Sequence, residues 1–354
     1  MRGFALTEWG HPLKEMEKPD PKPIGKEVLV KVRSCGLCHS DLHIQEGHFG
    51  GHGGDGPILN MAEHGVTLPL FAGHEIYGEI KDFGPLSGLT EADKGTPVIV
   101  FPWTGCQECE ACKAGHDEQC STPRFIGTHH PGGYADTIIV PQAKYCVNAE
   151  NVSPAQAGVC ACAGITALNA LHKLGPGKES YIAVIGLGGV GLMVVTVAKA
   201  LGFKKVMGID VDDAKLKAAK ASGADAVFNS NKAGVVDAIK AEARGGIVGV
   251  IDLVGITKTA ELGISLLQPP GGVYVVVGLA GGELRMPTVL MAELQYSLHG
   301  SHVGTLDDLN EFVGMVKQGK IKPIPATPVP MADINKCLDQ LRAGQVTGRL
   351  VMTW

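Results

Sequence analysis

The sequence lacks a strong excess of charge of either sign. Its 354 residues contain 31 Lys and Arg against 36 Asp and Glu, which gives a formal net charge of −5. A protein that binds nucleic acid or an anionic membrane surface usually carries a basic patch, and this composition offers little material for one. We therefore expect no nucleic acid and no membrane among the partners, and we favour a small-molecule substrate.

The N-terminal segment MRGFALTEWGHPLKEMEKPD lacks an apolar run of the length that a secretory signal peptide needs. The chain nevertheless has ten cysteines. Without an export signal, that number indicates a reducing compartment, where clustered thiols bind metal or take part in chemistry. We expect a cytoplasmic protein.

Charge is absent from residues 181 to 198, a stretch whose length alone would suit a membrane span. The glycines of GLGGVG interrupt it near its start, between a β-branched run and a helix-like run. We identify no second segment of this kind, and a lone span would be unexplained. The stretch is therefore interpreted as a strand, a tight turn and a buried helix.

Four cysteines are grouped in the segment CQECEACKAGHDEQC. Cys106, Cys109, Cys112 and Cys120 are separated by two, two and seven residues, and four such thiolates can enclose one tetrahedral zinc ion in a closed structural site. An iron–sulfur signature would place the fourth cysteine three residues on and follow it with proline, whereas Ser121 follows here. We favour zinc over an iron–sulfur cluster, and over disulfides because the CxxC thiols share one tight loop.

The length of the chain exceeds what one hydrophobic core usually serves, so two domains are expected. Its second half alternates short apolar runs with amphipathic stretches, which is typical of a doubly wound α/β sheet. The predicted parallel strands are 181–186, 205–210, 225–229, 248–255 and 271–279. The predicted helices between them are 190–201, 213–222, 234–244 and 257–267.

The first part of the chain, residues 1 to about 160, is rich in glycine and proline and predicts an irregular all-β unit. Its predicted strands are 27–36, 75–80, 96–102 and 134–140. The last fifty residues predict one helix at 331–343 and a closing strand at 348–354. No flexible linker separates the two units, so the cleft between them is the expected site.

Gly186, Gly188 and Gly191 form a GxGxxG pattern between a predicted strand and a predicted helix. In a dinucleotide site these glycines permit a tight turn, a close approach to the pyrophosphate and close packing of helix on strand. The helix start directs free N–H groups at the phosphates. Asp210 ends the next predicted strand, where a carboxylate hydrogen-bonds the ribose and repels a 2′-phosphate. We expect NAD rather than NADP.

Two alternatives stay open beside this turn. Asp210 could instead cap a helix that begins near Asp212 and Asp213. Lys215 is expected either to reach the same ribose or to lie on a solvated helix face.

Five motifs follow one another along the chain: CGLCHSDLH (35–43), GHE (73–75), the four-cysteine segment, CAGIT (162–166) and GLGGVG. Their order and approximate spacing resemble the zinc-containing alcohol dehydrogenases of the medium-chain dehydrogenase/reductase superfamily, over essentially the whole chain. The resemblance implies a Rossmann-type coenzyme domain beside a mainly β, GroES-like catalytic domain. It also implies NAD and two zinc ions per chain as cofactors.

The resemblance implies that Cys38, His74 and Cys162 hold a catalytic zinc ion with one position open. Taken alone, His74 would more often be a hydrogen-bonded core histidine. Cys35 and Cys160 are expected to be small buried residues outside this ligand set.

Asp41 and Glu75 resemble the acidic residues that orient the histidine ligand and tune the charge at the metal. The alternative for both is a plain surface carboxylate. Ser40 resembles the family's hydroxyl relay, and His43 the outer base that passes the alcohol proton to water while hydride goes to the nicotinamide. The alternative for His43 is a surface histidine.

Further coenzyme contacts are expected from residues on both predicted units. His39 and Arg349 resemble phosphate contacts, and Thr166 a support for the nicotinamide. Backbone or side-chain contacts are also expected at Gly189, Val190, Val254 and Val277.

The segment between His43 and His74 is longer than the family's common form and carries a glycine-rich insertion with His48, His52 and His64. These histidines have no fixed spacing and no acidic company, so we expect a loop near the cleft mouth rather than another metal site. Trp103 lies where the family often lines the substrate pocket with an aromatic ring. A medium-chain or aromatic alcohol is the expected substrate.

The expected activity is reversible hydride transfer between a primary or secondary alcohol and NAD, giving an aldehyde or ketone. A same-class alternative is a specialised dehydrogenase for a polyol or a hydroxyacyl-CoA thioester. A different-class alternative is a non-enzymatic binding relative, which is disfavoured because the ligand and relay residues are all present.

The expected domains are a catalytic domain at 1–162 with its structural zinc loop at about 101–121, an NAD-binding domain at 163–300, and a return segment at 301–354 that completes the catalytic domain. The segment STPRFIGTHHPGGYADTIIV follows the four-cysteine loop without the longer insertion of the dimeric animal enzymes. It resembles the tetrameric microbial and yeast forms, so we expect a homotetramer.

Overall fold

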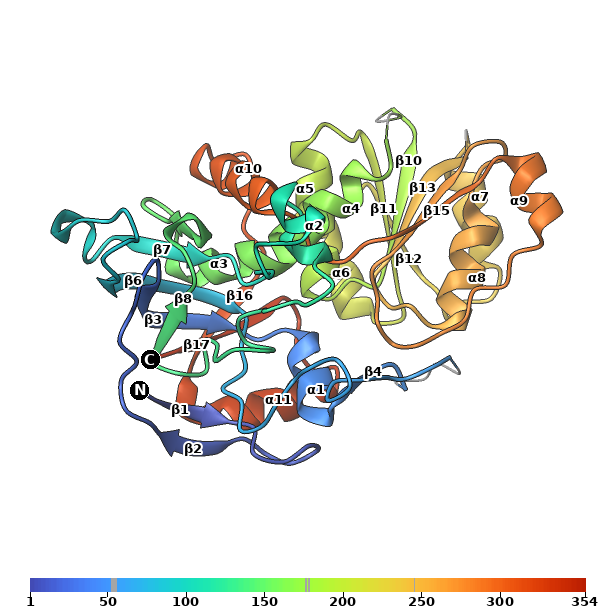
Figure 1. Cartoon of the computed structure of the whole chain (residues 1–354). Helices are drawn as coiled ribbons and strands as arrows, with labels where there is room; N and C mark the ends of the chain where they lie inside the picture. The colour runs from blue at the N-terminus through green and yellow to red at the C-terminus, as the bar shows by residue number, and fades with distance from the viewer. Residues whose placement is uncertain (52–55, 176, 178, 245) are drawn as a thin grey trace.

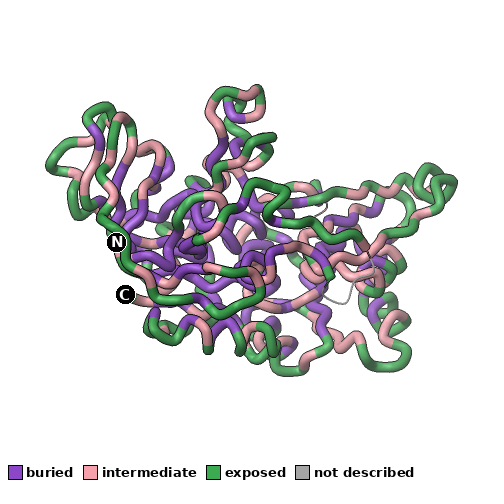
Figure 2. Tube along the Cα trace, turned by 60° about the horizontal axis from the view of Figure 1, so that its bottom comes forward, coloured by how far each residue is buried: buried purple, intermediate pink, exposed green. Residues whose placement is uncertain are grey.

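Two large sheets organise the chain (Figure 1). The computed structural model describes residues 1–51, 56–175, 177, 179–244 and 246–354. A six-stranded sheet forms the right half of the view and a seven-stranded sheet the left half, where both termini also lie. Figure 2 shows that buried residues concentrate along the centres of both halves and exposed residues along the outer loops.

The six-stranded sheet is parallel throughout, with the order β12-β11-β10-β13-β14-β15. Its strands are β10 (Tyr181–Ile185), β11 (Lys205–Asp210), β12 (Ala226–Asn229), β13 (Ile247–Asp252), β14 (Val273–Val276) and β15 (Ser297–Gly300). The first five confirm the predicted strands; β15 was not predicted. The strand order reverses between β10 and β13, which is where doubly wound sheets bind their ligands.

Helices cover both faces of this sheet: α5 and α6 lie on one side, and α7 and α8 on the other (Figure 1). They are α5 (Gly189–Ala200), α6 (Asp213–Ser222), α7 (Val235–Glu242) and α8 (Thr257–Leu266), followed by α9 (Thr288–Leu294). α6 begins where the Asp212 side chain accepts a hydrogen bond from Ala214 N at 2.7 Å, and it ends at Gly223, whose φ is +116°. Asp212, and not Asp210, therefore caps this helix.

The seven-stranded sheet has the order β16-β17-β3-β6-β7-β9, and β8 also pairs with β3. Its strands are β3 (Val28–Gly36), β6 (Glu75–Phe83), β7 (Pro97–Val100), β8 (Thr137–Val140), β9 (Cys146–Asn148), β16 (Ala326–Pro330) and β17 (Arg349–Thr353). In β3 the side chains of Lys31 and Arg33 face solvent while their apolar neighbours are buried, as expected of a strand with one covered face.

This half of the molecule is less purely β than predicted. It carries the helices α1 (His39–Glu46), α2 (Glu110–Lys113), α3 (Pro154–Val159) and α11 (Ile334–Arg342). A π-helical turn at Cys160–Gly164 leads from α3 into α4 (Ile165–His172), which packs against α5 of the other half. Two small strand pairs are β1 (Arg2–Ala5) with β2 (Lys14–Glu17) and β4 (His48–Phe49) with β5 (Leu59–Asn60). The 3-10 turns are Glu91–Asp93, Asp117–Gln119, Ala143–Tyr145 and Met331–Asp333.

The prediction of a single helix in the last fifty residues was wrong. A second helix, α10 (Leu306–Lys317), precedes α11, and β16 precedes β17. The sequence carried the signal for α10, because Thr305 and Asp308 form a reciprocal capping box and Leu309, Phe312 and Val313 are buried on one face. β17 then pairs antiparallel with β3 and returns the chain to the first sheet.

The uncharged stretch at 181–198 forms β10, a turn and α5, which confirms its interpretation. The statement that no second such segment exists was wrong. The helical run Pro154–His172 is also long and apolar enough for a span, but 78% of its apolar window is buried inside the protein. It is a core helix that carries one of the candidate metal ligands, Cys162.

Candidate active site and metal centres

The structure brings the seven predicted metal ligands together in two clusters. Within each cluster the candidate ligand atoms all lie within 4.8 Å of one another. The first cluster contains Cys106, Cys109, Cys112 and Cys120. The second contains Cys38, His74 and Cys162, and it also includes Glu75.

The four-cysteine cluster is built by one loop around α2. Cys106 Sγ accepts a hydrogen bond from Cys109 N at 3.4 Å, and Cys120 Sγ accepts one from Cys106 N at 3.3 Å. Backbone N–H groups of Glu108 and Cys109 lower the pKa of Cys106 to about 6, because they stabilise the thiolate. All ten cysteines are free of disulfides. Four convergent thiols, with backbone donors that favour the thiolate, fit a structural zinc ion.

The second cluster is assembled from three separate parts of the chain. Cys38 lies at the start of α1, His74 directly precedes β6, and Cys162 lies in the π-helical turn. The Sγ atoms of Cys38 and Cys162 are 3.9 Å apart although the residues are 124 positions apart in sequence. Such π turns are frequent at functional sites, because they redirect side chains within a helix.

The chemistry of this cluster fits a buried zinc ion. Both ring nitrogens of His74 and both carboxylate oxygens of Glu75 are buried without a well-aligned hydrogen bond among the described residues, although Asp41 and Arg349 lie beside them as ion-pair partners. Cys162 and Arg349 lower the pKa of Cys38 well below its usual range, and burial raises the pKa of Glu75 to about 7. Thiol, imidazole and carboxylate groups left unsatisfied in a dry site are the donors that zinc takes.

Asp41 connects two of the candidate ligands. Its Oδ2 accepts a hydrogen bond from Cys38 N at 2.8 Å, and its Oδ1 lies 3.5 Å from His74 Nδ1. That contact directs Nδ1 toward the carboxylate and leaves Nε2 for a metal ion. Asp41 and Glu75 are both buried, at 3% and 0% exposure, so neither is a surface carboxylate. Cys35 and Cys160 lie outside the cluster, with pKa values raised by burial.

Arg349 lies between the metal cluster and the glycine-rich turn. Its Nη2 is 3.0 Å from Glu75 Oε1, and its Nη1 donates to Leu37 O at 3.2 Å. A Cβ atom added to Gly189 would lie 2.7 Å from Arg349 Nε. Arg349 is only 5% exposed. Its side chain contacts both Glu75 of the metal cluster and the glycine-rich turn at Gly189.

The two predicted relay residues lie on α1 beside the second cluster. Ser40 is half-buried, with its Oγ 3.7 Å from Cys38 Sγ. His43 is 3% exposed, so it is not a surface histidine. Its ring packs against Phe49 at 5.2 Å and against His39 at 5.6 Å between centroids, and His39 itself is exposed. Ser40, His43 and His39 thus share α1, and of these three only His39 is exposed.

The glycine-rich turn has the geometry that a dinucleotide needs. Gly186 has φ +87°, and a Cβ on Gly191 would lie 2.0 Å from Gly186 O, so the turn and the contact between strand and helix both require glycine. A Cβ on Gly188 would meet nothing within 4 Å, which leaves open space above the turn. Asp210 Oδ2 accepts a hydrogen bond from Leu187 N at 2.6 Å, so the carboxylate sits at this turn.

The other predicted coenzyme residues surround the carboxyl ends of β10, β11, β13 and β14. Val190 is half-buried in the first turn of α5, Lys215 is half-buried on α6, and Thr166 is buried on α4. Val254 follows β13 and Val277 follows β14. A Cβ on Gly186 would lie 2.8 Å from the Val254 side chain, so these strand ends meet at one edge of the sheet.

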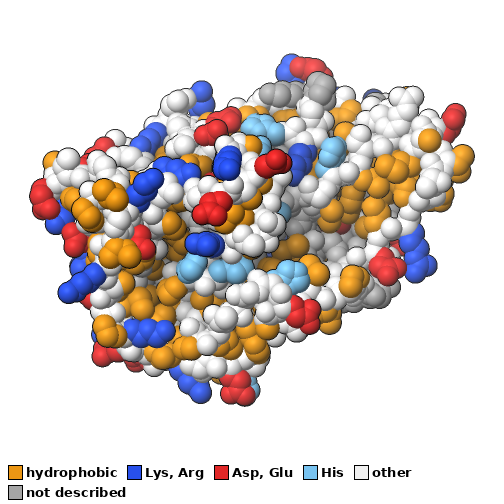
Figure 3. Space-filling model, viewed as in Figure 1, with side chains coloured by type: hydrophobic (Ala, Val, Ile, Leu, Met, Phe, Trp, Pro, Cys, Tyr) orange, Lys and Arg blue, Asp and Glu red, His pale blue; other side chains and the backbone are white. Residues whose placement is uncertain are grey.

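A cavity of about 660 Å³ opens between the four-cysteine loop, α4 and the ends of β14 and β15. Val277 lines it, as do several residues that sequence reasoning missed: His116, Glu118, Gln119, Asn169, Lys173, Val276, Gly278, Leu279, Gly300, Ser301, His302 and Thr305. Trp103 lies between this cavity and the metal cluster, with ring centroids 5.2 Å from His74 and 5.5 Å from His302. Figure 3 shows histidine side chains along the hollow between the two halves.

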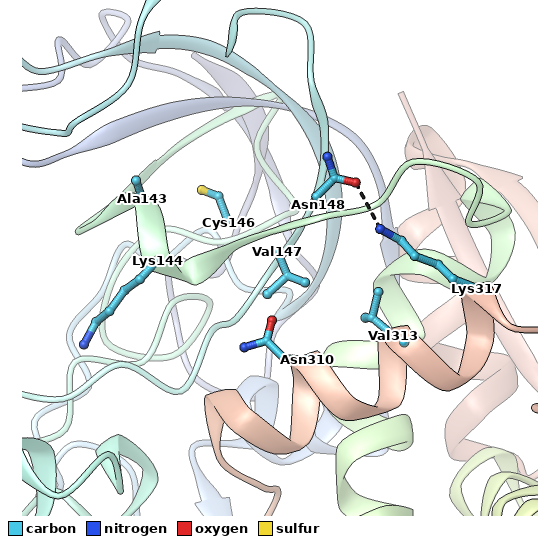
Figure 4. A pocket seen from close by; sticks show the side chains of 9 residues that line it. Ala143, Lys144, Cys146, Val147, Asn148, Asn310, Val313 and Lys317 are labelled. Carbon is cyan, nitrogen blue, oxygen red and sulfur yellow. Dashed lines mark hydrogen bonds between the residues drawn. The ribbon is translucent and has the colours of Figure 1, made fainter.

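A second cavity, of about 370 Å³, lies between α10 and the segment from Ala143 to Asn148 (Figure 4). Lys317 Nζ donates to Asn148 Oδ1 at 3.0 Å across it, and Cys146, Val147 and Val313 line its wall. None of its lining residues belongs to either metal cluster. We therefore do not assign it to the reaction.

The described part of the insertion runs from the catalytic half to the coenzyme half. Gly50 N donates to Leu279 O at 3.1 Å, and Gly56 N donates to Gly281 O at 2.7 Å. His48 and His64 each place Nδ1 near a backbone carbonyl of their own loop, and neither belongs to a ligand cluster. His52 lies outside the described residues. Among the described residues of the insertion, neither histidine joins a ligand cluster, and the segment contacts the coenzyme half through Leu279 and Gly281.

The parallel sheet with its glycine-rich turn, joined to a β unit that holds a thiol–imidazole–carboxylate cluster, defines a class: zinc-dependent dehydrogenases with a Rossmann-type coenzyme domain. Comparison with known families places the chain within this class. Residues 25–151 match the alcohol dehydrogenase GroES-like domain, and residues 189–318 match the zinc-binding dehydrogenase domain.

Individual relatives and solved structures agree with these matches. An NAD-dependent alcohol dehydrogenase of Sulfurisphaera tokodaii is 35% identical, over 99% of both chains. An alcohol dehydrogenase of Geobacillus stearothermophilus is 33% identical, again over 99% of both chains. The crystal structure of the Aeropyrum pernix alcohol dehydrogenase covers 100% of both chains with a TM-score of 0.88 and 30% identity. The chain belongs to the zinc-containing alcohol dehydrogenase family of the medium-chain dehydrogenase/reductase superfamily, which confirms the resemblance.

The four-cysteine loop yields a first prediction. Cys109→Ser should remove one zinc ion per chain and lower the thermal unfolding midpoint by roughly 5 °C or more, because a structural zinc site contributes directly to folding. Elemental analysis and calorimetry would measure the two effects. Cys146→Ser is the matched control, since Cys146 is a free, half-buried cysteine outside both clusters. Unchanged zinc content in Cys109→Ser would contradict the assignment.

Proposed function

We propose that the protein is an NAD-dependent zinc alcohol dehydrogenase that transfers hydride reversibly between an alcohol and NAD. The observation that carries this proposal is the buried cluster of Cys38, His74 and Cys162, which Arg349 joins to the coenzyme turn. The relatives above are named alcohol dehydrogenases, so a polyol or hydroxyacyl-CoA substrate is not favoured.

Two zinc ions per chain are proposed. The four cysteines would hold one, and Cys38, His74 and Cys162 the other, with Glu75 near enough to approach the same ion. When bound, zinc supplies Lewis acidity toward the alcohol oxygen and NAD supplies the hydride acceptor. Asp41 fixes the orientation of His74 through Nδ1, and Trp103 closes the site with an apolar wall because its indole N–H already donates to Ala161 O.

The alcohol proton is proposed to leave through α1. Ser40 would take the proton beside Cys38, and His43 would carry it outward. His39, exposed at the start of α1 and in ring contact with His43, lies on the solvent side of this route. Its proposed role is to contact the coenzyme phosphates together with Arg349.

The coenzyme is proposed to lie across the carboxyl edge of the six-stranded sheet. Gly186, Gly188 and the start of α5 would receive the pyrophosphate, and Asp210 the adenosine ribose, with Lys215 nearby on α6. The remaining proposed contacts are Thr166, Gly189, Val190, Gly191, Val254 and Val277.

The pairing of strands supports three domain segments, 1–162, 163–300 and 301–354. β16 and β17 follow the coenzyme sheet in sequence, yet they pair with β3 in the catalytic sheet. A cytoplasmic location is proposed because ten cysteines, all free of disulfides, suit a reducing compartment.

A homotetramer is proposed for the assembly. β15 ends the order of the six-stranded sheet as an edge strand, and Ser297, His299 and Gly300 on it are exposed. Nearby, α9 exposes Val289 at 70% and Leu290 at 46%, and Figure 3 shows hydrophobic side chains over this end of the molecule. An open strand edge beside an apolar surface suits pairing with another copy of the chain.

The activity is tested by following NADH formation over a panel of benzylic, medium-chain and secondary alcohols. The parent enzyme should turn over at least one of these classes. His74→Ala should fold normally but lose more than about 10³-fold in kcat/KM, because one zinc ligand is missing. His172→Ala, at an exposed histidine outside the cluster, is the control. Full activity in His74→Ala would reject the site.

Coenzyme choice tests the role of Asp210. The parent enzyme should have a higher kcat/KM with NAD than with NADP. Asp210→Ser should narrow that preference by about tenfold or more, because both the hydrogen bonds and the repulsion of a 2′-phosphate are lost. Steady-state kinetics with both coenzymes measure the ratio. Asp213→Ser, in the first turn of α6, is a nearby control that should leave it unchanged.

The proton route predicts a pH-dependent defect. His43→Gln should slow alcohol oxidation on the order of 10²-fold near and below neutral pH, where solvent hydroxide is too scarce to replace the base. Added imidazole should restore part of the rate. The decrease in kcat will be smaller if coenzyme release, and not proton transfer, limits turnover. A parent-like pH profile of kcat/KM, with no response to imidazole, would show that the proton leaves elsewhere.

The assembly is tested by light scattering of the purified protein at micromolar concentration. A mass of about four chains is expected. Replacing Val289 and Leu290 with Asp should reduce that mass, because charge would replace the apolar surface. A stable dimer in the parent protein would contradict the tetramer.

A further inference from the structure

His302 presents an unoccupied hydrogen-bonding group to the 660 Å³ cavity. It follows β15, lines the cavity and is exposed there. Within the described part of the chain, neither of its ring nitrogens has a hydrogen-bond partner. A neutral imidazole donates from one nitrogen and accepts at the other, so this ring offers both functions to a ligand.

The aromatic side chains around His302 connect it to the candidate zinc ligands. Its centroid is 5.5 Å from that of Trp103, edge-on, and 6.2 Å from that of Phe125, stacked. Trp103 in turn contacts His74. A group bound near His74 could therefore extend along Trp103 to His302.

The groups near His302 differ in whether they can still form a hydrogen bond with a ligand. The indole N–H of Trp103 is already satisfied by Ala161 O, and Phe125 offers only its ring. Ser301, beside His302, has a buried hydroxyl with no hydrogen-bond partner among the described residues. Leu279, which also lines the cavity, is apolar. The cavity thus combines an apolar side chain with the hydrogen-bonding groups of Ser301 and His302, while Trp103 and Phe125 pack against the His302 ring.

We propose that His302 is a specificity-determining residue that binds a second polar group of the substrate, and that the preferred substrates are aromatic alcohols with a hydroxyl group on the ring. The proposal rests on the alcohol dehydrogenase activity proposed above. The aliphatic side chains of the cavity bind the ring by burial, and Trp103 and Phe125 hold the His302 imidazole in place. His302 exchanges a hydrogen bond with the ring hydroxyl, which a methyl group of similar size cannot form.

The experiment compares kcat/KM for hydroxybenzyl alcohols and for methylbenzyl alcohols substituted at the same ring position. The parent enzyme should favour the hydroxyl compound by roughly 5- to 10-fold at one position. His302→Phe should bring the ratio near one, with most of the change in KM, while turnover of the methyl compound stays within about threefold. His302→Gln, which keeps a donor and an acceptor, should restore part of the preference.

His172→Phe provides the matched control, because this exposed histidine at the end of α4 does not line the cavity. Its substrate ratio should equal that of the parent. A parent enzyme without preference, a ratio unchanged in His302→Phe, or an effect confined to KM for NAD would overturn the inference. In each of these cases the methyl compound is still oxidised. Failure to oxidise any alcohol would reject the proposed function itself, and this inference with it.

Discussion

The buried cluster of Cys38, His74, Glu75 and Cys162 is the constraint on which the rest of the site depends. Several ionisable groups share a volume with almost no access to water, and an unpaired buried charge costs several kcal/mol. Asp41 and Arg349 offset part of that charge, but the His74 and Glu75 atoms remain without hydrogen bonds among the described residues. A cation that takes one donor atom from each ligand offsets much of the remaining negative charge in this volume.

The metal ligands come together where the catalytic sheet meets the coenzyme half of the molecule. Cys38 starts a helix after β3, His74 precedes the neighbouring β6, and Cys162 lies on the core helix that leads into the coenzyme half. Arg349 returns on β17, which pairs with β3. Because Arg349 touches both Glu75 and the turn at Gly189, charge at the metal cluster and geometry at the coenzyme turn are directly linked.

Most of the coenzyme half could be predicted from the sequence because its signals are local. Each buried strand is a short apolar run, and α6 matched its predicted range because the Asp212 cap and the Gly223 end are encoded beside it. β15 was missed because SLHG is short, half-exposed and has no distinctive pattern. α10 was missed although the sequence contains its capping box at Thr305 and Asp308. A local pattern for this helix was therefore present in the sequence.

The sequence by itself determined the family, the coenzyme fold and the types of metal ligand, since motif order, glycine spacing and cysteine spacing are properties of neighbouring residues. Only the tertiary structure decided which distant groups meet. It placed Glu75 within the cluster with Cys38 and Cys162, left Cys35 and Cys160 outside it, and set His302 behind Trp103 at the cavity. The contacts between Cys38 and Cys162 and between Trp103 and His302 join residues more than a hundred positions apart. They depend on sheet register and helix packing, which no local pattern encodes.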